Sequence, residues 1–356
     1  MPLSIDFSGK LVLITGGGRG IGLAITEALA EAGADIAISY TSTDATPVAT
    51  QLSSKHGVTV KAFKCNVDSS AEIDKLVGDV QEAFGREVDI GVNNAGIALW
   101  QSSIHMTDNQ FDSIFRTNTT GPYYLSRALM RSWLGLPISL SSSSPELNLT
   151  ADDGQPKKNL KGKQILFVSS ISGLVAMTPQ YQAAYNASKA GVTMLAKSLA
   201  AEWAPYEVVI NSVSPGYVST DMIANPPDEQ ARGWVKVWEE RTPIGRFASA
   251  EEIGKFIAVL LSQHAAGAGF MTGSDVVIDG GESRTVYPGR VSLLMFLRSM
   301  TQDILCTERG GEQPCWTDAY VKRRFVGCNE DCRQKMMYPT AIPFLERAAE
   351  CFMDSV

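Results

Sequence analysis

Short apolar segments alternate with longer amphipathic stretches along most of the chain. The short segments are apolar at nearly every position, which is typical of strands buried on both faces of a sheet. We expect strands at residues 11–14, 36–40, 60–63, 90–92, 165–168, 208–213 and 276–278. The longer stretches repeat apolar residues at helical spacing, and they predict helices at residues 21–32, 70–84, 108–133, 183–203 and 250–261.

A regular alternation of strands and helices predicts an α/β fold in which a parallel sheet carries helices on both faces. Because crossovers between parallel strands are right-handed, we expect a Rossmann-type doubly wound sheet of about seven strands. Such sheets bind their ligands at the carboxyl ends of the strands. Candidate functional residues are therefore sought where the expected strands end.

The pattern is interrupted at two places. Residues 135–162 include four consecutive serines followed by proline, aspartate and glycine, a composition that indicates an exposed insertion. The strand and helix pattern then stops near Tyr287. We therefore expect one Rossmann-fold domain at residues 1–287 and a C-terminal extension at residues 288–356, whose structure the pattern leaves open.

Five of the six cysteines lie in this extension. The extension has no histidine, and its closest pair, Cys328 and Cys332, has no second pair to complete a zinc site, so we predict no metal. A disulfide is not expected in a cytosolic protein. We interpret the extension as poorly ordered, or as sequence joined on by an imperfect gene model.

The net charge is −7 at pH 7, and 44% of the residues are hydrophobic. An acidic chain lacks the basic patches that nucleic acid and anionic membranes require. The chain starts MPLSIDFSGK, without a secretory signal, and no apolar run approaches the ~20 residues of a membrane-spanning helix. We expect a cytoplasmic protein whose partner is a small molecule, with no nucleic acid or membrane partner.

A glycine-rich segment, TGGGRGIG at residues 15–22, joins the first expected strand to the first expected helix. Glycines let the backbone turn tightly against a pyrophosphate, and the helix N-terminus supplies amide donors and the positive end of a dipole. A glycine-rich turn alone is a weak signal. Between a strand and a helix, it predicts a dinucleotide-binding site.

The end of the second strand distinguishes the two nicotinamide dinucleotides. A carboxylate there would bind the 2′-hydroxyl of NAD and repel the 2′-phosphate of NADP. Tyr40 ends this strand, and no acidic residue follows before Asp44. Arg19, within the glycine turn, is interpreted as facing the phosphate, with a solvated loop arginine as the alternative. The pattern favours NADP(H).

Tyr185 and Lys189 stand four residues apart on an expected helix and share one of its faces. A free phenol has a pKa of about 10, and a nearby ammonium lowers it by favouring the phenolate. Such a phenol would donate a proton to a carbonyl oxygen, or take one from an alcohol. The same spacing also arises when a tyrosine packs on a lysine stem. Ser169 and Ser170, at the end of strand 165–168, place a hydroxyl at the ligand-binding edge.

The order of these motifs resembles that of the short-chain dehydrogenase/reductase family. TGGGRGIG is followed by NNAG at residues 93–96, an asparagine in RTNTTGPYY, a serine after a buried strand, Tyr-x-x-x-Lys and SPGYVSTDM. The resemblance covers residues 7–287. Its nearest branch is the fungal group of sorbose-reductase-like and NADP-dependent mannitol 2-dehydrogenase-like enzymes, through stretches such as RTPIGRFA.

The resemblance implies a role for each matching residue. Asn118 would hold the water of a proton relay, Ser170 would orient the carbonyl, and Tyr185 would be the acid and base. Lys189 would also bind the nicotinamide ribose. The implied cofactor-binding residues are Gly16, Arg19, Gly20, Ile21, Gly22, Tyr40, Asn66, Val67, Asn93, Ala95, Gly96, Tyr185, Lys189, Pro215, Gly216, Val218 and Thr220.

Two positions depart from the family pattern or are ambiguous within it. Asn66 replaces the acidic residue that is usual in the adenine pocket, and its amide can still bond to adenine. The catalytic serine has two neighbours, Ser169 and Ser172. We choose Ser170 because it aligns best with the following Gly173.

The implied activity is the reversible NADPH-linked reduction of a ketone to a secondary alcohol, by a homodimer or homotetramer. Two substrate classes stay open: a ketose that becomes a polyol, and a secondary-metabolite ketone, handled by a tailoring ketoreductase of fungal polyketide-type biosynthesis. A non-catalytic NADP(H)-binding regulatory protein is a further alternative. Trp234, Val237 and Trp238 are interpreted either as part of a mobile substrate lid or as ordinary packing.

Overall fold

The computed structural model describes residues 5–140, 158–220, 229–265 and 269–284. They belong to a unit that spans Met1–Thr285, and the second unit, Val286–Val356, lies outside the described residues. The insertion expected at residues 135–162 is described only at its two ends. The limits of the domain, the insertion and the extension with its cysteines therefore stay predictions.

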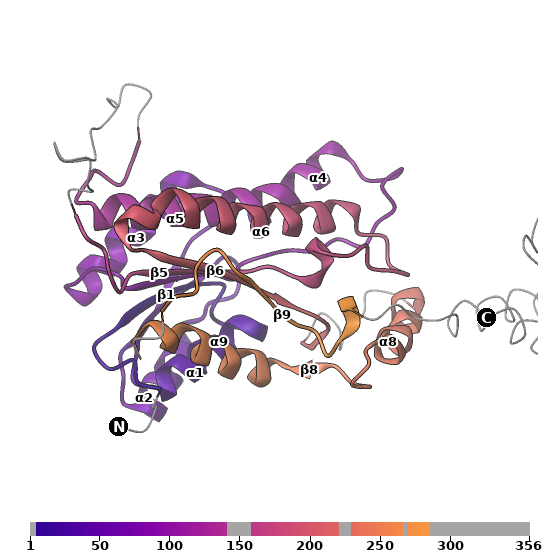
Figure 1. Ribbon diagram of the computed structural model, residues 1–356, viewed down its shortest axis with the longest axis horizontal. Helices are drawn as coiled ribbons and strands as arrows, with labels where there is room; N and C mark the ends of the chain where they lie inside the picture. The colour runs from indigo at the N-terminus through magenta and orange to yellow at the C-terminus, as the bar shows by residue number, and fades with distance from the viewer. Residues whose placement is uncertain (1–4, 141–157, 221–228, 266–268, 285–356) are drawn as a thin grey trace, which may run out of the picture. The chain divides into compact units, whose positions relative to one another are not determined.

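The centre of the fold is a parallel sheet of seven strands in the order β3-β2-β1-β4-β5-β6-β9 (Figure 1). Every neighbouring pair is parallel. The strands are β1 (Leu11–Thr15), β2 (Asp35–Tyr40), β3 (Val60–Lys64), β4 (Ile90–Asn93), β5 (Gln164–Val168), β6 (Val209–Pro215) and β9 (Asp275–Ile278). The expected Rossmann-type fold and its seven strands are confirmed.

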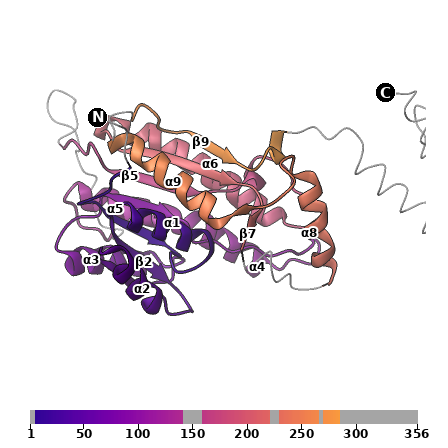
Figure 2. The same cartoon turned by 90° about the horizontal axis from the view of Figure 1, so that it is seen from below.

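Helices cover both faces of this sheet (Figures 1 and 2). Successive side chains of a strand point to opposite faces, so Leu11 and Leu13 join one core cluster, whereas Val12 and Ile14 join the other. The first cluster packs against α3 (Ser70–Phe84), α5 (Gly121–Trp133) and α6 (Ala183–Trp203). The second packs against α1 (Gly20–Glu31), α2 (Thr46–His56) and α9 (Ala250–Ala265). Burial on both faces explains why the strands are apolar throughout.

The structure contains two helices that the periodicity does not predict, α2 and α8 (Glu229–Arg241). The buried residues of α2 are Ala49 and Leu52, so its apolar stripe is too narrow to stand out in the sequence. A small parallel sheet pairs β7 (Val218–Ser219) with β8 (Ala248–Ser249) and so joins the segments on either side of α8.

The single helix expected at residues 108–133 is interrupted. α4 (Asp108–Phe115) continues into a π-helical turn, η1 (Arg116–Thr120), and then into α5. The prediction of one regular helix is therefore wrong, because one turn is widened while the apolar spacing on each side stays helical. Turns of this type are frequent at functional sites, and this one contains Asn118.

The strand order reverses between β1 and β4. The chain runs outward from β1 to β3, and then returns to place β4 on the other side of β1. At such a switch the loops that leave the two strands diverge and form a crevice at the carboxyl ends. The fold thus directs the glycine turn and the NNAG segment to one place.

Candidate active site

The glycine-rich turn between β1 and α1 is packed too closely for side chains. Gly16 and Gly20 have positive φ angles of 66° and 53°, which other residues rarely adopt. A Cβ on Gly22 would lie 2.1 Å from the Gly16 carbonyl oxygen, and one on Gly17 would lie 2.5 Å from Ile38 Cγ2. The turn therefore presents bare backbone at the N-terminus of α1, which fits the pyrophosphate of a dinucleotide.

Asn94 and Thr15 fasten this turn to the loop after β4. Asn94 Nδ2 donates to the carbonyl oxygens of Thr15, at 2.9 Å, and Gly16, at 3.2 Å. Thr15 Oγ1 accepts from the backbone N–H groups of Asn94 and Ala95, both at 3.1 Å. The two sides of the strand switch are thus held together before any ligand binds.

Two further residues of the NNAG segment, Asn93 and Gly96, have different surroundings. Asn93 is buried, and its Nδ2 donates to Ser126 Oγ at 3.1 Å, so it can meet a nucleotide only through its backbone. A Cβ on Gly96 would lie 3.3 Å from Asn118 Oδ1 and 3.5 Å from Lys189 Nζ. This loop therefore connects the glycine turn to the expected catalytic residues.

The other expected cofactor residues lie near the same carboxyl edge of the sheet, namely Ile21, Asn66, Val67, Pro215, Gly216, Val218 and Thr220. A Cβ on Gly20 would lie 3.7 Å from Thr220 Cγ2, so the segment after β6 reaches the glycine turn. Two loops that are far apart in sequence thus face each other across the place expected for a dinucleotide.

The residues expected to select the dinucleotide lie in the glycine turn and at the end of β2. Arg19 is exposed at the N-cap of α1. Asp44 Oδ1 accepts from the backbone N–H and the hydroxyl of Thr46, at 2.9 and 2.7 Å. Partial desolvation and then the charge of Asp44 raise the pKa of Tyr40. Asp44 therefore lies beside the Tyr40 hydroxyl, but its carboxylate is bonded to the start of α2.

Two of the three serines after β5 bond to protein groups other than the Tyr185 phenol. Ser169 is buried and donates to the Lys189 carbonyl oxygen at 3.0 Å, and it shares a hydrogen bond of 2.8 Å with Thr193. Ser172 Oγ accepts from Gln182 Nε2 at 3.0 Å. Ser169 is thus turned into the interior against α6, whereas Ser172 stays near the cavity described below.

Ser170 is the serine beside the phenol. Its Oγ accepts from the Ser172 backbone N–H at 3.1 Å, and its hydrogen bond to Tyr185 acts to lower the pKa of that phenol. A Cβ on Gly173 would lie 2.7 Å from the Ala190 nitrogen. The 3-10 turn after Ser170 therefore rests directly on α6 and holds Ser170 close to Tyr185.

Tyr185 and Lys189 lie one turn apart on α6. Lys189 Nζ is 5.7 Å from the centre of the Tyr185 ring and donates to the Val168 carbonyl oxygen at 2.8 Å. Burial lowers the pKa of Lys189 to about 8. Burial also raises the pKa of Tyr185, and the hydrogen bond to Ser170 only partly opposes this. Burial and the Ser170 hydrogen bond account for the direction of the phenol pKa, and the lowering of that pKa by Lys189 stays a prediction.

Asn118 clamps the loop after β4 to α6. It is buried on the π turn, and its Oδ1 accepts from the Ile97 backbone N–H at 2.8 Å. Its Nδ2 donates to the Ile97 carbonyl oxygen at 2.9 Å and to Ser188 Oγ at 3.0 Å. These bonds hold the loop after β4 against α6, the helix that carries Tyr185. The water-holding role of Asn118 stays a prediction.

A cavity of about 190 Å³ opens over these groups, and Ser170, Ser172 and Tyr185 line it. Two tryptophans, Trp100 and Trp238, form part of its apolar wall. Their ring centres lie 5.5 Å apart, and Trp238 is fully buried. Trp238 thus packs as an interior residue and also faces the cavity, while the lid motion stays a prediction.

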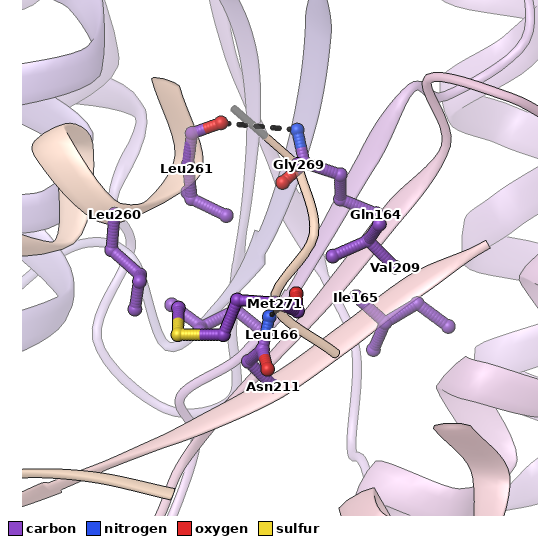
Figure 3. Close-up of a pocket in the computed structure, with 9 residues that line it drawn as sticks. All are labelled: Gln164, Ile165, Leu166, Val209, Asn211, Leu260, Leu261, Gly269 and Met271. Carbon is purple, nitrogen blue, oxygen red and sulfur yellow. Dashed lines mark hydrogen bonds between the residues drawn. The ribbon is translucent and has the colours of Figure 1, made fainter. Parts of the chain in front are cut away.

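A second hollow lies at the opposite, amino edge of the sheet, between β5, β6 and α9 (Figure 3). Its volume is about 10 Å³, enough for one water molecule. Gln164 Nε2 donates across it to the Leu261 carbonyl oxygen at 3.1 Å. It is too small for a substrate.

Within the described ranges no group of acidic, histidine and cysteine side chains is arranged to bind a metal, and no helix could span a membrane.

Comparison with known proteins identifies the family. A family model described as short chain dehydrogenase matches residues 10–144, and one described as Enoyl-(Acyl carrier protein) reductase matches residues 149–283. A sorbose reductase of Candida albicans is 36% identical over 78% of this chain and 88% of its own length. This chain belongs to the short-chain dehydrogenase/reductase family. The resemblance found in the motifs is confirmed.

Other members of the short-chain dehydrogenase/reductase family agree with this assignment. An NADP-dependent mannitol dehydrogenase of Alternaria alternata is 37% identical over 79% of this chain and 98% of its own length. The crystal structure of a short-chain type dehydrogenase/reductase from Mycobacterium marinum has a TM-score of 0.66 and 32% identity, and covers 79% of this chain and 98% of its own. About a fifth of this chain thus has no counterpart in these relatives.

Sequence reasoning missed several positioning residues of this short-chain dehydrogenase/reductase. The second asparagine of NNAG, Asn94, was available as a signal because an amide after a buried strand needs hydrogen-bond partners. Gln180, Gln182 and Tyr217 carry no local signal. Their importance depends on contacts with α8 and with the segment after β5, which only the tertiary fold brings together.

Proposed function

We propose that this family member is an NADPH-dependent oxidoreductase that reversibly reduces a ketone to a secondary alcohol. The observation that carries the proposal is a buried phenol, Tyr185, placed beside Ser170 and Lys189 on a cavity near the glycine turn. A purely regulatory dinucleotide-binding protein would need no such proton donor. Tight NADPH binding without oxidation across a broad ketone panel would favour that alternative.

A bound nicotinamide would supply or accept the hydride, and the residues of the chain would handle the carbonyl oxygen. Ser170 accepts from Ser172, and its own proton, which otherwise bonds to Tyr185, would bond and orient that oxygen when a ketone is bound. Tyr185, kept protonated by burial, donates its proton as the oxygen gains charge. Lys189, fixed by Val168, stabilises the resulting phenolate.

Replacing Ser170 with alanine is expected to lower kcat for ketone reduction by about 10²-fold, because it removes a donor aimed at the developing negative charge. Ser172→Ala is expected to cost less than about tenfold, because Ser172 binds Gln182 and lies farther from the proton transfer. Steady-state kinetics on both variants tests the assignment. If Ser172→Ala alone abolished turnover, the catalytic serine would have been chosen wrongly.

NADP(H) use is supported by Arg19, exposed at the N-cap of α1, and by the NADP-dependent mannitol dehydrogenase among the relatives. Arg19→Gln is expected to lower kcat/KM for NADPH by about tenfold or more, because a charged hydrogen bond to the 2′-phosphate contributes roughly 1.5–3 kcal/mol. The value for NADH should not change, which provides the control. A clear preference of the unmodified protein for NADH would contradict the assignment.

Ketone reduction is expected to slow as the pH rises through about 8, the value to which burial lowers the pKa of Lys189. Above that pH the lysine loses the charge that stabilises the phenolate of Tyr185. Alcohol oxidation should instead speed up with pH, because it needs the phenolate, and the pKa of the phenol is raised. Rates in both directions across the pH range test this. Reduction that became faster above pH 8 would contradict it.

We propose a ketose as the substrate, with the corresponding polyol as the product. The sorbose reductase and the mannitol dehydrogenase among the relatives support this class. The alternative, a tailoring ketoreductase, would act on an aromatic or polyketide-type ketone. A panel of ketoses and aromatic ketones with NADPH distinguishes them by kcat/KM. The homodimer or homotetramer and the cytoplasmic location stay predictions.

A further inference from the structure

We propose that the Tyr217 hydroxyl is a second substrate-binding donor, positioned by Gln180 and Trp238, and that it selects ketones that carry another oxygen close to the reacting carbonyl. This inference rests on the proposed ketone reduction and adds a specificity-determining residue to the same site. It follows from the direction of hydrogen bonds in a short chain of three buried or partly buried side chains.

The Trp238 indole sets the direction of this chain. An indole N–H can only donate, and Trp238 Nε1 lies 2.8 Å from Gln180 Oε1. The amide of Gln180 is therefore oriented with its nitrogen toward Tyr217, 3.0 Å from the hydroxyl oxygen. An amide nitrogen also only donates, so the Tyr217 oxygen accepts and its proton must point elsewhere.

That proton has no acceptor within the part of the chain that the structure describes. Glu282 and Arg241 act on Tyr217 only through space, and Glu282 Oε2 accepts from Thr242 Oγ1 at 3.2 Å. Burial raises the pKa of Tyr217, so its phenol stays protonated. The hydroxyl is therefore a donor that still needs a partner.

The position of the ring directs this donor to the substrate. Tyr217 lines the same cavity as Ser170 and Tyr185. Its ring stacks on Trp238, with centres 4.8 Å apart and planes 15° from parallel, and it also contacts Phe247 at 5.7 Å. A ring held in this way loses little conformational freedom when it binds a ligand.

Ser172 also lines this cavity and, like Tyr217, carries a hydroxyl next to a glutamine amide. Its oxygen accepts from Gln182 Nε2, which leaves its proton available as well. Much of the remaining lining is apolar and includes Ile171, Met177 and Trp100. A ketone without a second oxygen would leave the Tyr217 and Ser172 hydroxyls without partners, whereas a hydroxyketone would bond to them. Sites that bond to a substrate hydroxyl discriminate strongly against the analogue that lacks this hydroxyl.

The test compares two matched ketones, 2-butanone and 3-hydroxy-2-butanone, with NADPH. We expect kcat/KM of the unmodified protein to be about tenfold higher for the hydroxyketone. Tyr217→Phe should lower the value for the hydroxyketone by about tenfold and change that for 2-butanone by less than about twofold. The ratio of the two values is taken within one preparation, so it does not depend on the folded fraction. Tyr206→Phe, which removes a phenol hydroxyl outside this cavity, should leave the ratio unchanged.

Gln180→Glu tests the positioning without removing the phenol. A carboxylate accepts from both Trp238 and Tyr217, so it would draw the Tyr217 proton away from the cavity and remove the preference for the hydroxyketone. An equal loss on both ketones in Tyr217→Phe, an unchanged ratio in Gln180→Glu, or no preference in the unmodified protein would overturn the inference while ketone reduction stands. No turnover of any ketone by the unmodified protein would overturn the proposed function itself, and the role of Tyr217 with it.

Discussion

Replacing Tyr185 with phenylalanine is expected to lower kcat for ketone reduction by about 10³-fold, within the range that a positioned general acid supplies. The substitution removes one hydroxyl from a buried ring and leaves α6 intact. The Kd for NADPH should therefore change by less than about twofold, which a fluorescence titration measures.

Tyr206→Phe provides the matched control. Tyr206 packs against the core cluster just after α6 and does not line the cavity. It should keep full activity. Turnover that persists in Tyr185→Phe at the level of Tyr206→Phe would remove Tyr185 from the reaction and leave the candidate site without a proton donor.

Gly22→Ala is expected to weaken NADPH binding by about tenfold or more. The new Cβ would lie 2.1 Å from the Gly16 carbonyl oxygen and 2.5 Å from Asn94 Nδ2, so the turn must open. Overpacking of this kind costs about 1–3 kcal/mol, and here it acts on the backbone that would bind the pyrophosphate. Both the Kd for NADPH and the Tm should move in the unfavourable direction.

Gly78→Ala is the matched control for this change. Gly78 lies within α3, and nothing lies within 4 Å of the position of its Cβ. Alanine is preferred over glycine in a helix by about 1 kcal/mol, so this variant should be slightly more stable and should bind NADPH normally. NADPH binding by Gly22→Ala that matched Gly78→Ala would mean that the dinucleotide binds elsewhere.

The sheet could be predicted because its strands are buried on both faces. Each strand is apolar at consecutive positions, and Leu11 to Ile14 show how both core clusters draw on one short run. The candidate site was predictable where its residues are close in sequence, as in the glycine turn or the pair of Tyr185 and Lys189. Short spacing on a known element determines geometry without knowledge of the fold.

What could not be predicted depends on contacts between distant segments. The π turn at Asn118 does not alter the apolar spacing around it, so no pattern marks it. The pKa of Tyr185 depends on burial, which spacing does not report. Tyr217 is connected to Gln180 and Trp238 only after three separate segments have come together.

The most direct test of the proposed chemistry is to follow the hydrogen that is transferred. NADPH that carries deuterium at both C4 positions is incubated with the purified protein and a ketose, and the polyol is examined by mass spectrometry and NMR. We expect one deuterium at the carbon that was the carbonyl, and none when Tyr185→Phe replaces the unmodified protein over the same time. A polyol without deuterium at that carbon, or no polyol from any ketone supplied, would contradict hydride transfer at this site.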